Sequence, residues 1–233
     1  MRLRAGMPRR LHFDAARAGK VAVVSLDQLA CSTDVKQKID APFTALLDPP
    51  VDEGGKMLRV FAFDVEGTDM GAFLGRTNMG LAPESADLNK SLKRQSALCY
   101  TQGEDPPGVT YLDGKAYGQT GKWIQSGALT RHVHGGVLIV WTKDDAGVCR
   151  ARLHVGFERI GKGPGSEVPA AYNRFAVSAV CMQGHAGCKF IMFPELAAEA
   201  EAELRNGEEG FEAWLKQKRA ELPSCLASCC LIA

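Results

Sequence analysis

Two strand-like runs joined by a short turn constrain the fold of this chain more than any other feature. Gly136–Thr142 is continuously apolar, and Cys149–Phe157 alternates between polar and apolar residues. Between them, Lys143–Gly147 (KDDAG) supplies the Asp and Gly residues that suit a hairpin turn. The sequence therefore predicts an antiparallel pair of strands in this region.

The alternating run also predicts which of its side chains are buried. Successive side chains of a strand point to opposite faces, so Arg152 and His154 share one face while Leu153 and Val155 share the other. In an antiparallel sheet, one face commonly packs on the core and the other is solvated. We therefore expect Leu153 and Val155 to be buried, and Arg152 and His154 to be accessible to solvent.

Further short apolar runs repeat the strand pattern along the chain. They are Val21–Leu26, Pro42–Asp48, Leu58–Val65, Phe175–Met182 and Lys189–Phe193. Glycine, proline and small polar residues dominate between residues 67 and 121, where we expect long, turn-rich connections. About eight short strands without a βαβ rhythm predict a mainly β fold, an antiparallel jelly roll or β-sandwich.

The sequence divides into four parts. We predict a basic arm at residues 1–20, a jelly-roll-like β-sandwich domain at 21–193, a helical extension at 194–222 and a cysteine-rich tail at 223–233. The extension is rich in Ala, Glu, Leu and Lys, with an interruption near Asn206–Gly207 and an end at Pro223. Its apolar stripe predicts a helix packed on the sheet or on another copy of the chain.

Composition narrows the class of protein. The 233 residues are 45% hydrophobic and 24% charged, which predicts a folded chain with a sizeable core. No run approaches the roughly 18–20 apolar residues that span a bilayer, and no secretory leader is recognisable. We therefore expect an intracellular protein whose eight cysteines are mostly free thiols.

Basic residues gather in the arm and on the polar side of the predicted strands. The candidates are Arg2, Arg4, Arg9, Arg10, Arg17, Lys20, Arg150, Arg152 and Arg159. Such side chains neutralise phosphates without reading bases, so they are candidate contacts for single-stranded RNA. A solvated or targeting-type N-terminus carries a similar charge, and that alternative remains open.

The last four residues, Cys230-Leu231-Ile232-Ala233, match the prenylation pattern, and the terminal Ala indicates a farnesyl group. One lipid chain gives only marginal membrane binding, so a second signal is expected. Cys225 and Cys229 are the candidates for palmitoylation. The alternative is a short cysteine-rich tail that packs on the domain.

Two motifs could belong to metal sites, and both are incomplete. Cys181, His185 and Cys188 have the ligand types of a zinc site but no evident fourth ligand, and the two glycines among them favour a hairpin turn. Asp64 and Glu66 resemble the first motif of DEDD-type 3′–5′ exonucleases, in which paired carboxylates hold two metals. The further acidic motifs of that family are missing. We therefore expect no catalytic residue, metal or cofactor.

Several segments resemble plant-virus proteins. Val137–Ile160 is similar to the paired strands near the C-terminus of bromovirus and cucumovirus coat proteins. Ala45–Asp48, Leu58–Phe63 and Thr77–Pro83 (TNMGLAP) are similar to the central strands of 30K-type movement proteins. Both families are jelly-roll proteins, and the resemblance covers roughly residues 40–160. The extension beyond the last strand departs from the coat pattern and suits a movement protein, which works at membranes around plasmodesmata.

The resemblance implies a viral movement protein without catalytic residues. Such a protein would bind RNA or viral ribonucleoprotein non-specifically, form a homo-oligomer and support cell-to-cell transport of the viral genome through plasmodesmata. It would be found in the host cytoplasm and, through a lipidated tail, at host membranes. The alternatives are a jelly-roll capsid (coat) protein and a metal-dependent 3′–5′ exonuclease.

Overall fold

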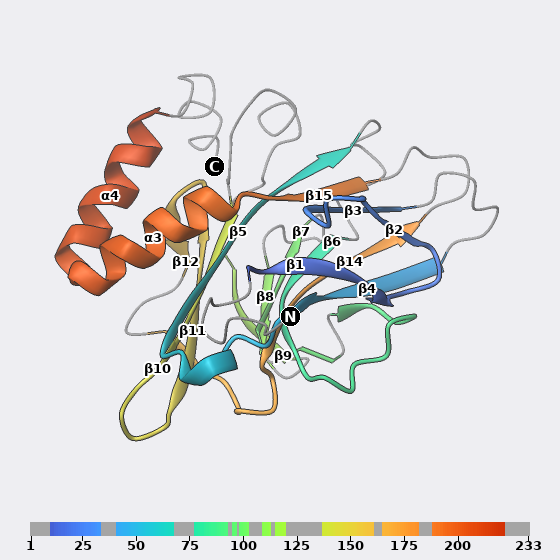
Figure 1. Ribbon diagram of the computed structural model, residues 1–233, viewed down its shortest axis with the longest axis horizontal. Helices are drawn as coiled ribbons and strands as arrows, with labels where there is room; N and C mark the ends of the chain where they lie inside the picture. The colour runs from blue at the N-terminus through green and yellow to red at the C-terminus, as the bar shows by residue number, and fades with distance from the viewer. Residues whose placement is uncertain are drawn as a thin grey trace, which may run out of the picture.

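The chain folds into two antiparallel sheets packed face to face, followed by two helices (Figure 1). The computed structural model describes residues 10–33, 41–67, 77–92, 95–96, 98–102, 109–112, 115–119, 137–160, 165–181 and 188–221. This architecture confirms the predicted antiparallel β-sandwich of jelly-roll type with a C-terminal helical extension. Neither described helix has the length and apolar character needed to cross a membrane.

The first sheet has seven strands and is closed at one edge by the N-terminal strand. Its order is β1 (His12–Ala18), β4 (Ala41–Asp48), β14 (Arg174–Cys181), β6 (Thr77–Ala82), β7 (Leu98–Gln102), β8 (Val109–Leu112) and β9 (Lys115–Gln119). The pairing of β1 with β4 shifts register between Phe13 and Ala18. The sandwich therefore begins at His12, within the residues predicted to form a separate basic arm.

The second sheet contains the predicted hairpin. Its order is β12 (Glu158–Ile160), β11 (Cys149–Val155), β10 (Val137–Lys143), β5 (Leu58–Gly67), β15 (Cys188–Met192), β3 (Ala30–Thr33) and β2 (Ala22–Val24), and β13 (Ser166–Glu167) also pairs with β11. A short 3-10 helix, η1 (Glu53–Gly55), precedes β5. The register from Val137 opposite Val155 to Lys143 opposite Cys149 confirms the hairpin.

Aromatic side chains fill the space between the two sheets. Phe61 and Phe63 of β5 stack with ring centroids 4.4 Å apart, and Phe61 also stacks on Phe175 of β14 at 5.4 Å. Phe43 and Phe190 are fully buried in the same cluster. Because this core draws on strands of both sheets, it fixes the two layers against each other.

The outer face of the second sheet is covered by helices α3 (Pro194–Asn206) and α4 (Glu208–Glu221), which lie together on one side of the sandwich (Figure 1). Phe211, Trp214 and Leu215 of α4 belong to one buried cluster with side chains of β5 and β10. Gly207 separates the helices with a φ of +122°, a conformation that favours glycine. The predicted interruption near Asn206–Gly207 is thus confirmed.

The outer face of the first sheet is covered by the segment that follows β6. The backbone N–H of Thr44 donates to the carbonyl oxygen of Leu88 at 2.8 Å, and that of Leu92 donates to Ser178 Oγ at 3.1 Å. Leu92 packs there with apolar residues of β4, β6 and β14. Both sheets are therefore covered on both faces in this region, which explains why β10 and β14 are almost continuously apolar.

Candidate nucleic-acid interface

The six cations predicted for the arm have different surroundings. Arg2, Arg4 and Arg9 lie outside the described residues. Arg10 is exposed just before β1, and Lys20 is exposed in the turn after it. Because β1 is part of the first sheet, the fold positions the backbone at these two residues.

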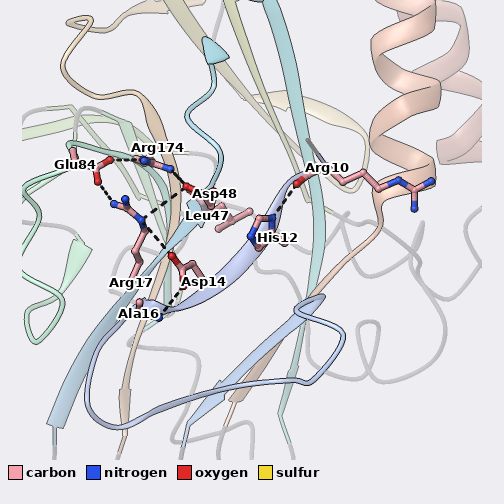
Figure 2. A network of polar contacts seen from close by, with 9 residues as sticks. All are labelled: Arg10, His12, Asp14, Ala16, Arg17, Leu47, Asp48, Glu84 and Arg174. Carbon is pink, nitrogen blue, oxygen red and sulfur yellow. Dashed lines mark hydrogen bonds and ion pairs between the residues drawn. The ribbon is translucent and has the colours of Figure 1, made fainter. Parts of the chain in front are cut away.

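Arg17, near the C-terminal end of β1, is held by carboxylates in a network (Figure 2). Its Nε lies 3.4 Å from Asp14 Oδ2 and 3.9 Å from Asp48 Oδ1, and its Nη1 pairs with Glu84. Arg174, on β14, forms ion pairs of 2.5 Å with the same Asp48 and Glu84. Two guanidinium groups thus share three carboxylates. The network ties β1, β4, β14 and the segment after β6 together and does not favour a phosphate.

The polar face of β11 is covered, so one of the accessibility predictions was wrong. Leu153 and Val155 are buried as expected, but Arg152 and His154 are only 6% and 0% exposed. The ring of Phe211 on α4 lies 5.3 Å from the Arg152 guanidinium carbon and meets the His154 ring edge-on at 5.5 Å. Alternation correctly assigned the side chains to opposite faces of β11, but α4 excludes solvent from the face of Arg152 and His154.

The other two candidate arginines on the strands are also not freely exposed. Arg150 is partly exposed, and it binds Asp144 at 2.7 Å and Glu167 at 3.5 Å. The hydrogen bond from Arg150 lowers the pKa of Asp144, so this pair stays ionised. Arg159 is half-buried on β12. Arg150, Arg152 and Arg159 therefore do not form an open interface for RNA in this arrangement.

A cleft of about 360 Å³ brings Arg10 together with two cations that the sequence did not single out, Lys56 and Arg59. It lies between the residues before β1, the start of β5, and the segment that leads from β15 into α3. Figure 2 shows Arg10 pointing away from the Arg17 network. Residues of the first turn of α3 line the cleft, so the positive end of the helix dipole adds to the three cations.

Carboxylates offset part of this positive charge. Glu195 and Glu201 also line the cleft. Glu201 is already engaged, because it accepts hydrogen bonds from the Val60 backbone N–H at 3.1 Å and from Arg205 at 2.9 Å. Partial burial and then the nearby Arg59 lower the pKa of Lys56. The charge of a bound anion would stabilise the protonated form of Lys56, so the cleft favours an anionic partner.

The candidate zinc ligands lie outside the part of the chain that the structure describes in full. His185 lies outside the described residues, and the side chains of Cys181 and Cys188 are likewise outside them. The segment between these cysteines joins β14 of the first sheet to β15 of the second, so the predicted hairpin turn was wrong. In the described ranges, no group of three His, Cys, Asp or Glu side chains could hold a metal ion.

The exonuclease-like motif lies in a different setting from the one its chemistry requires. Asp64 is buried on β5 in an antiparallel sheet. The parallel sheet with interleaved helices that the motif implies is not this fold.

The lipidation candidates Cys225, Cys229 and Cys230 lie outside the described residues. Cys31 and Cys149 are buried free thiols, and burial raises the pKa of Cys31 to about 12, so its thiol stays protonated.

Comparison with known proteins gives distant structural similarity without a family. No family model matches the chain, and no curated protein does. Among solved structures, stonustoxin has a TM-score of 0.48 at 10% identity, with 78% of this chain covering 28% of that one. The TRIM65 PSpry domain also has a TM-score of 0.48, at 13% identity, with 79% and 92% covered. A legume lectin-like domain from Entamoeba histolytica has a TM-score of 0.43 at 10% identity, with 78% and 86% covered. None of these similarities assigns a function.

Proposed function

We propose that this protein binds single-stranded RNA non-specifically, through phosphate contacts that run from its N-terminal arginines into the cleft at Arg10. The observation that carries this proposal is the meeting of Arg10, Lys56 and Arg59 in one cleft beside the start of α3. Arg2, Arg4 and Arg9 precede Arg10 in the sequence. A chain of phosphates bound at the cleft could therefore continue along the N-terminal segment.

The lining of the cleft favours phosphates over bases. Non-specific binders of single strands combine a basic groove with aromatic side chains on which bases stack. Here the rings at the cleft are Phe61, which is fully buried in the core, and Phe193, which is half-buried. Base stacking would contribute little, so affinity would come mainly from charge and would depend strongly on salt.

Transport of a viral genome between cells is the physiological role that we propose for this RNA binding, on the resemblance to 30K-type movement proteins. The jelly-roll sandwich is compatible with movement and coat proteins alike. The helical extension past the last strand favours the movement protein, because the coat pattern ends soon after that strand. Lipid attachment at Cys230, with Cys225 or Cys229, and assembly into a homo-oligomer stay predictions.

Fluorescence anisotropy with a labelled oligouridine of about 20 nucleotides tests the RNA proposal. We expect binding of the wild-type protein to weaken steeply as salt is raised. Each phosphate contact contributes about 0.7 to the slope of log affinity against log salt for a single strand. The double variant Arg10→Gln/Lys56→Gln should therefore flatten the slope by about 1.4.

A matched control uses exposed lysines away from the cleft. Lys189 on β15 and Lys216 on α4 are both exposed. The double variant Lys189→Gln/Lys216→Gln removes the same net charge and should leave the salt slope close to that of wild type. Equal slopes in all three proteins, or binding that does not respond to salt, would refute the proposed interface.

A further inference from the structure

Three basic side chains form a second cluster between the second sheet and α4, away from the cleft. Arg152 and His154 lie on one face of β11, and Arg159 of β12 is directly opposite His154 in the strand register. Arg152 and His154 are buried, and Arg159 is half-buried. Phe211 of α4 covers Arg152 and His154. We call these three residues the buried basic cluster.

Six nitrogen atoms of the buried basic cluster have no hydrogen-bond partner in the described part of the chain. They are Nε and Nη2 of Arg152, Nε and Nη2 of Arg159, and Nδ1 and Nε2 of His154. Buried polar atoms in folded proteins almost always have a partner, so these six atoms indicate an acceptor that the described residues do not supply.

The unpartnered atoms are arranged in a way that suits an oxyanion. In each arginine, Nε and Nη2 form the same edge of the guanidinium group, with two parallel N–H bonds. That edge binds two oxygens of a carboxylate or phosphate at once. Both arginines therefore have this two-donor edge unused, while the remaining nitrogen of Arg152, Nη1, binds Glu208 at 2.8 Å.

The net charge of the buried basic cluster also favours an anionic ligand. Among the described residues, Arg152 of this cluster forms an ion pair with Glu208, whose side chain is 64% exposed. Glu158, next to Arg159 on β12, lies 3.8 Å from Arg219 of α4. Burial, with Arg152 and Arg159 nearby, lowers the pKa of His154 to about 3, so its ring is neutral and adds no charge. Among the described residues, Glu208 is the carboxylate paired with this cluster, and it pairs with Arg152, so two guanidinium groups leave an excess of positive charge.

We propose that the buried basic cluster of Arg152, His154 and Arg159 binds a phosphate-type oxyanion, as inorganic phosphate or as the terminal phosphate of a nucleotide. The Nε–Nη2 edges of both arginines donate to its oxygens, and the His154 ring donates one further hydrogen bond. β12 is the last strand of the second sheet and Arg159 is half-buried, so the ligand enters along Arg159 at this edge. This site is independent of the RNA interface proposed at the cleft.

Thermal unfolding of the full chain with sodium phosphate, at constant ionic strength set by sodium chloride, tests the site. We expect phosphate to raise the Tm of wild type and to have little effect on Arg159→Gln. Lys216→Gln is the matched control, because it removes one positive charge from an exposed residue of α4 that is not part of the buried basic cluster. Its response to phosphate should equal that of wild type. Circular dichroism of the unliganded variants checks that each is folded.

A second measurement does not depend on a variant. In NMR spectra, phosphate should shift the ring signals of His154 in a saturable way, whereas chloride at the same ionic strength should not. Repeating the titration with uridine 5′-monophosphate separates the two sources, because tighter binding than inorganic phosphate identifies a nucleotide terminal phosphate. An unchanged His154 signal, or equal stabilisation of wild type and Arg159→Gln, would show that water alone serves these atoms and would overturn the proposal.

Discussion

The burial of His154 predicts a specific dependence of stability on pH. Burial, followed by the charges of Arg152 and Arg159, lowers its pKa from 6.5 to about 3 in the folded protein. Between these two values the unfolded chain binds a proton that the folded chain does not. The neutral ring therefore contributes its full stability above pH 6.5, and this contribution is lost as the pH falls towards 3.

The size of the effect follows from the two pKa values. Each pH unit inside this window changes the free energy of unfolding by about 1.4 kcal/mol. From pH 6.5 to pH 4, His154 alone should therefore destabilise the protein by about 3 kcal/mol. That is a large part of the total stability of an ordinary domain, roughly 5–15 kcal/mol.

Urea denaturation at pH 7, 6, 5 and 4, followed by tryptophan fluorescence, measures this dependence. Trp141 and Trp214 are both buried and should report unfolding. His154→Leu is the comparison, because it keeps an apolar group against Phe211 and removes the titration. The carboxylates titrate in both proteins, so the difference between them isolates His154. Buffers without phosphate or sulfate are needed, since a bound oxyanion would raise the pKa of the ring.

Two results would refute this reasoning. One is an identical decline in stability for wild type and His154→Leu between pH 6.5 and pH 4. The other is a pKa near 6.5 for the His154 ring in an NMR titration of the folded protein. Either would mean that α4 does not cover the polar face of β11.

Three substitutions test other parts of the structure by chemical denaturation. Phe211→Ala should reduce the free energy of unfolding by about 3–5 kcal/mol, because this ring of α4 is fully buried against β11. Arg174→Met should cost about 3 kcal/mol, since it leaves the partly buried Asp48 without its closest cation. Gly19→Ala should cost at least about 1–3 kcal/mol, because the new methyl group would collide with the carbonyl oxygen of Leu88 and the segment must shift.

Exposed positions on the same elements provide the controls. Glu212 follows Phe211 on α4, and Ala16 lies on β1 close to Gly19; both are exposed. Glu212→Ala and Ala16→Ser should each change the free energy of unfolding by less than about 0.5 kcal/mol. Comparable losses in the controls and the test variants would show that the measured effects do not come from the contacts named above.

Local patterns predicted the elements whose formation depends on neighbouring residues. The β10–β11 hairpin follows from an apolar run, a turn sequence and an alternating run that are contiguous in the chain. The break at Gly207 follows from a residue that favours the backbone it needs there. Strands β7 to β9 were missed because their segment is rich in glycine and small polar residues, and pairing with β6 and with one another holds them in place.

The features that the sequence could not predict depend on contacts between segments that are far apart in the chain. Arg152 and Glu208 are 56 positions apart, and nothing within β11 indicates that a helix lies over its polar face. The cleft likewise depends on bringing Arg10 to the start of β5 and the first turn of α3. A single signal was present: Arg59 interrupts a run of apolar strand residues, and a charged residue at such a position indicates a special environment.

The covered faces and short outer strands of the sandwich affect how copies of this protein can meet. Two sheets commonly associate through an apolar face or by extending a sheet at its edge, and here helices and the segment after β6 occupy the outer faces. At the edges, β2 and β12 have three residues each, and the pairings of β1 and β9 depart from regular register. Short or irregular edge strands protect against uncontrolled growth of a sheet from chain to chain. A homo-oligomer of this chain would therefore assemble through its helices and connections, with each sandwich remaining a separate unit.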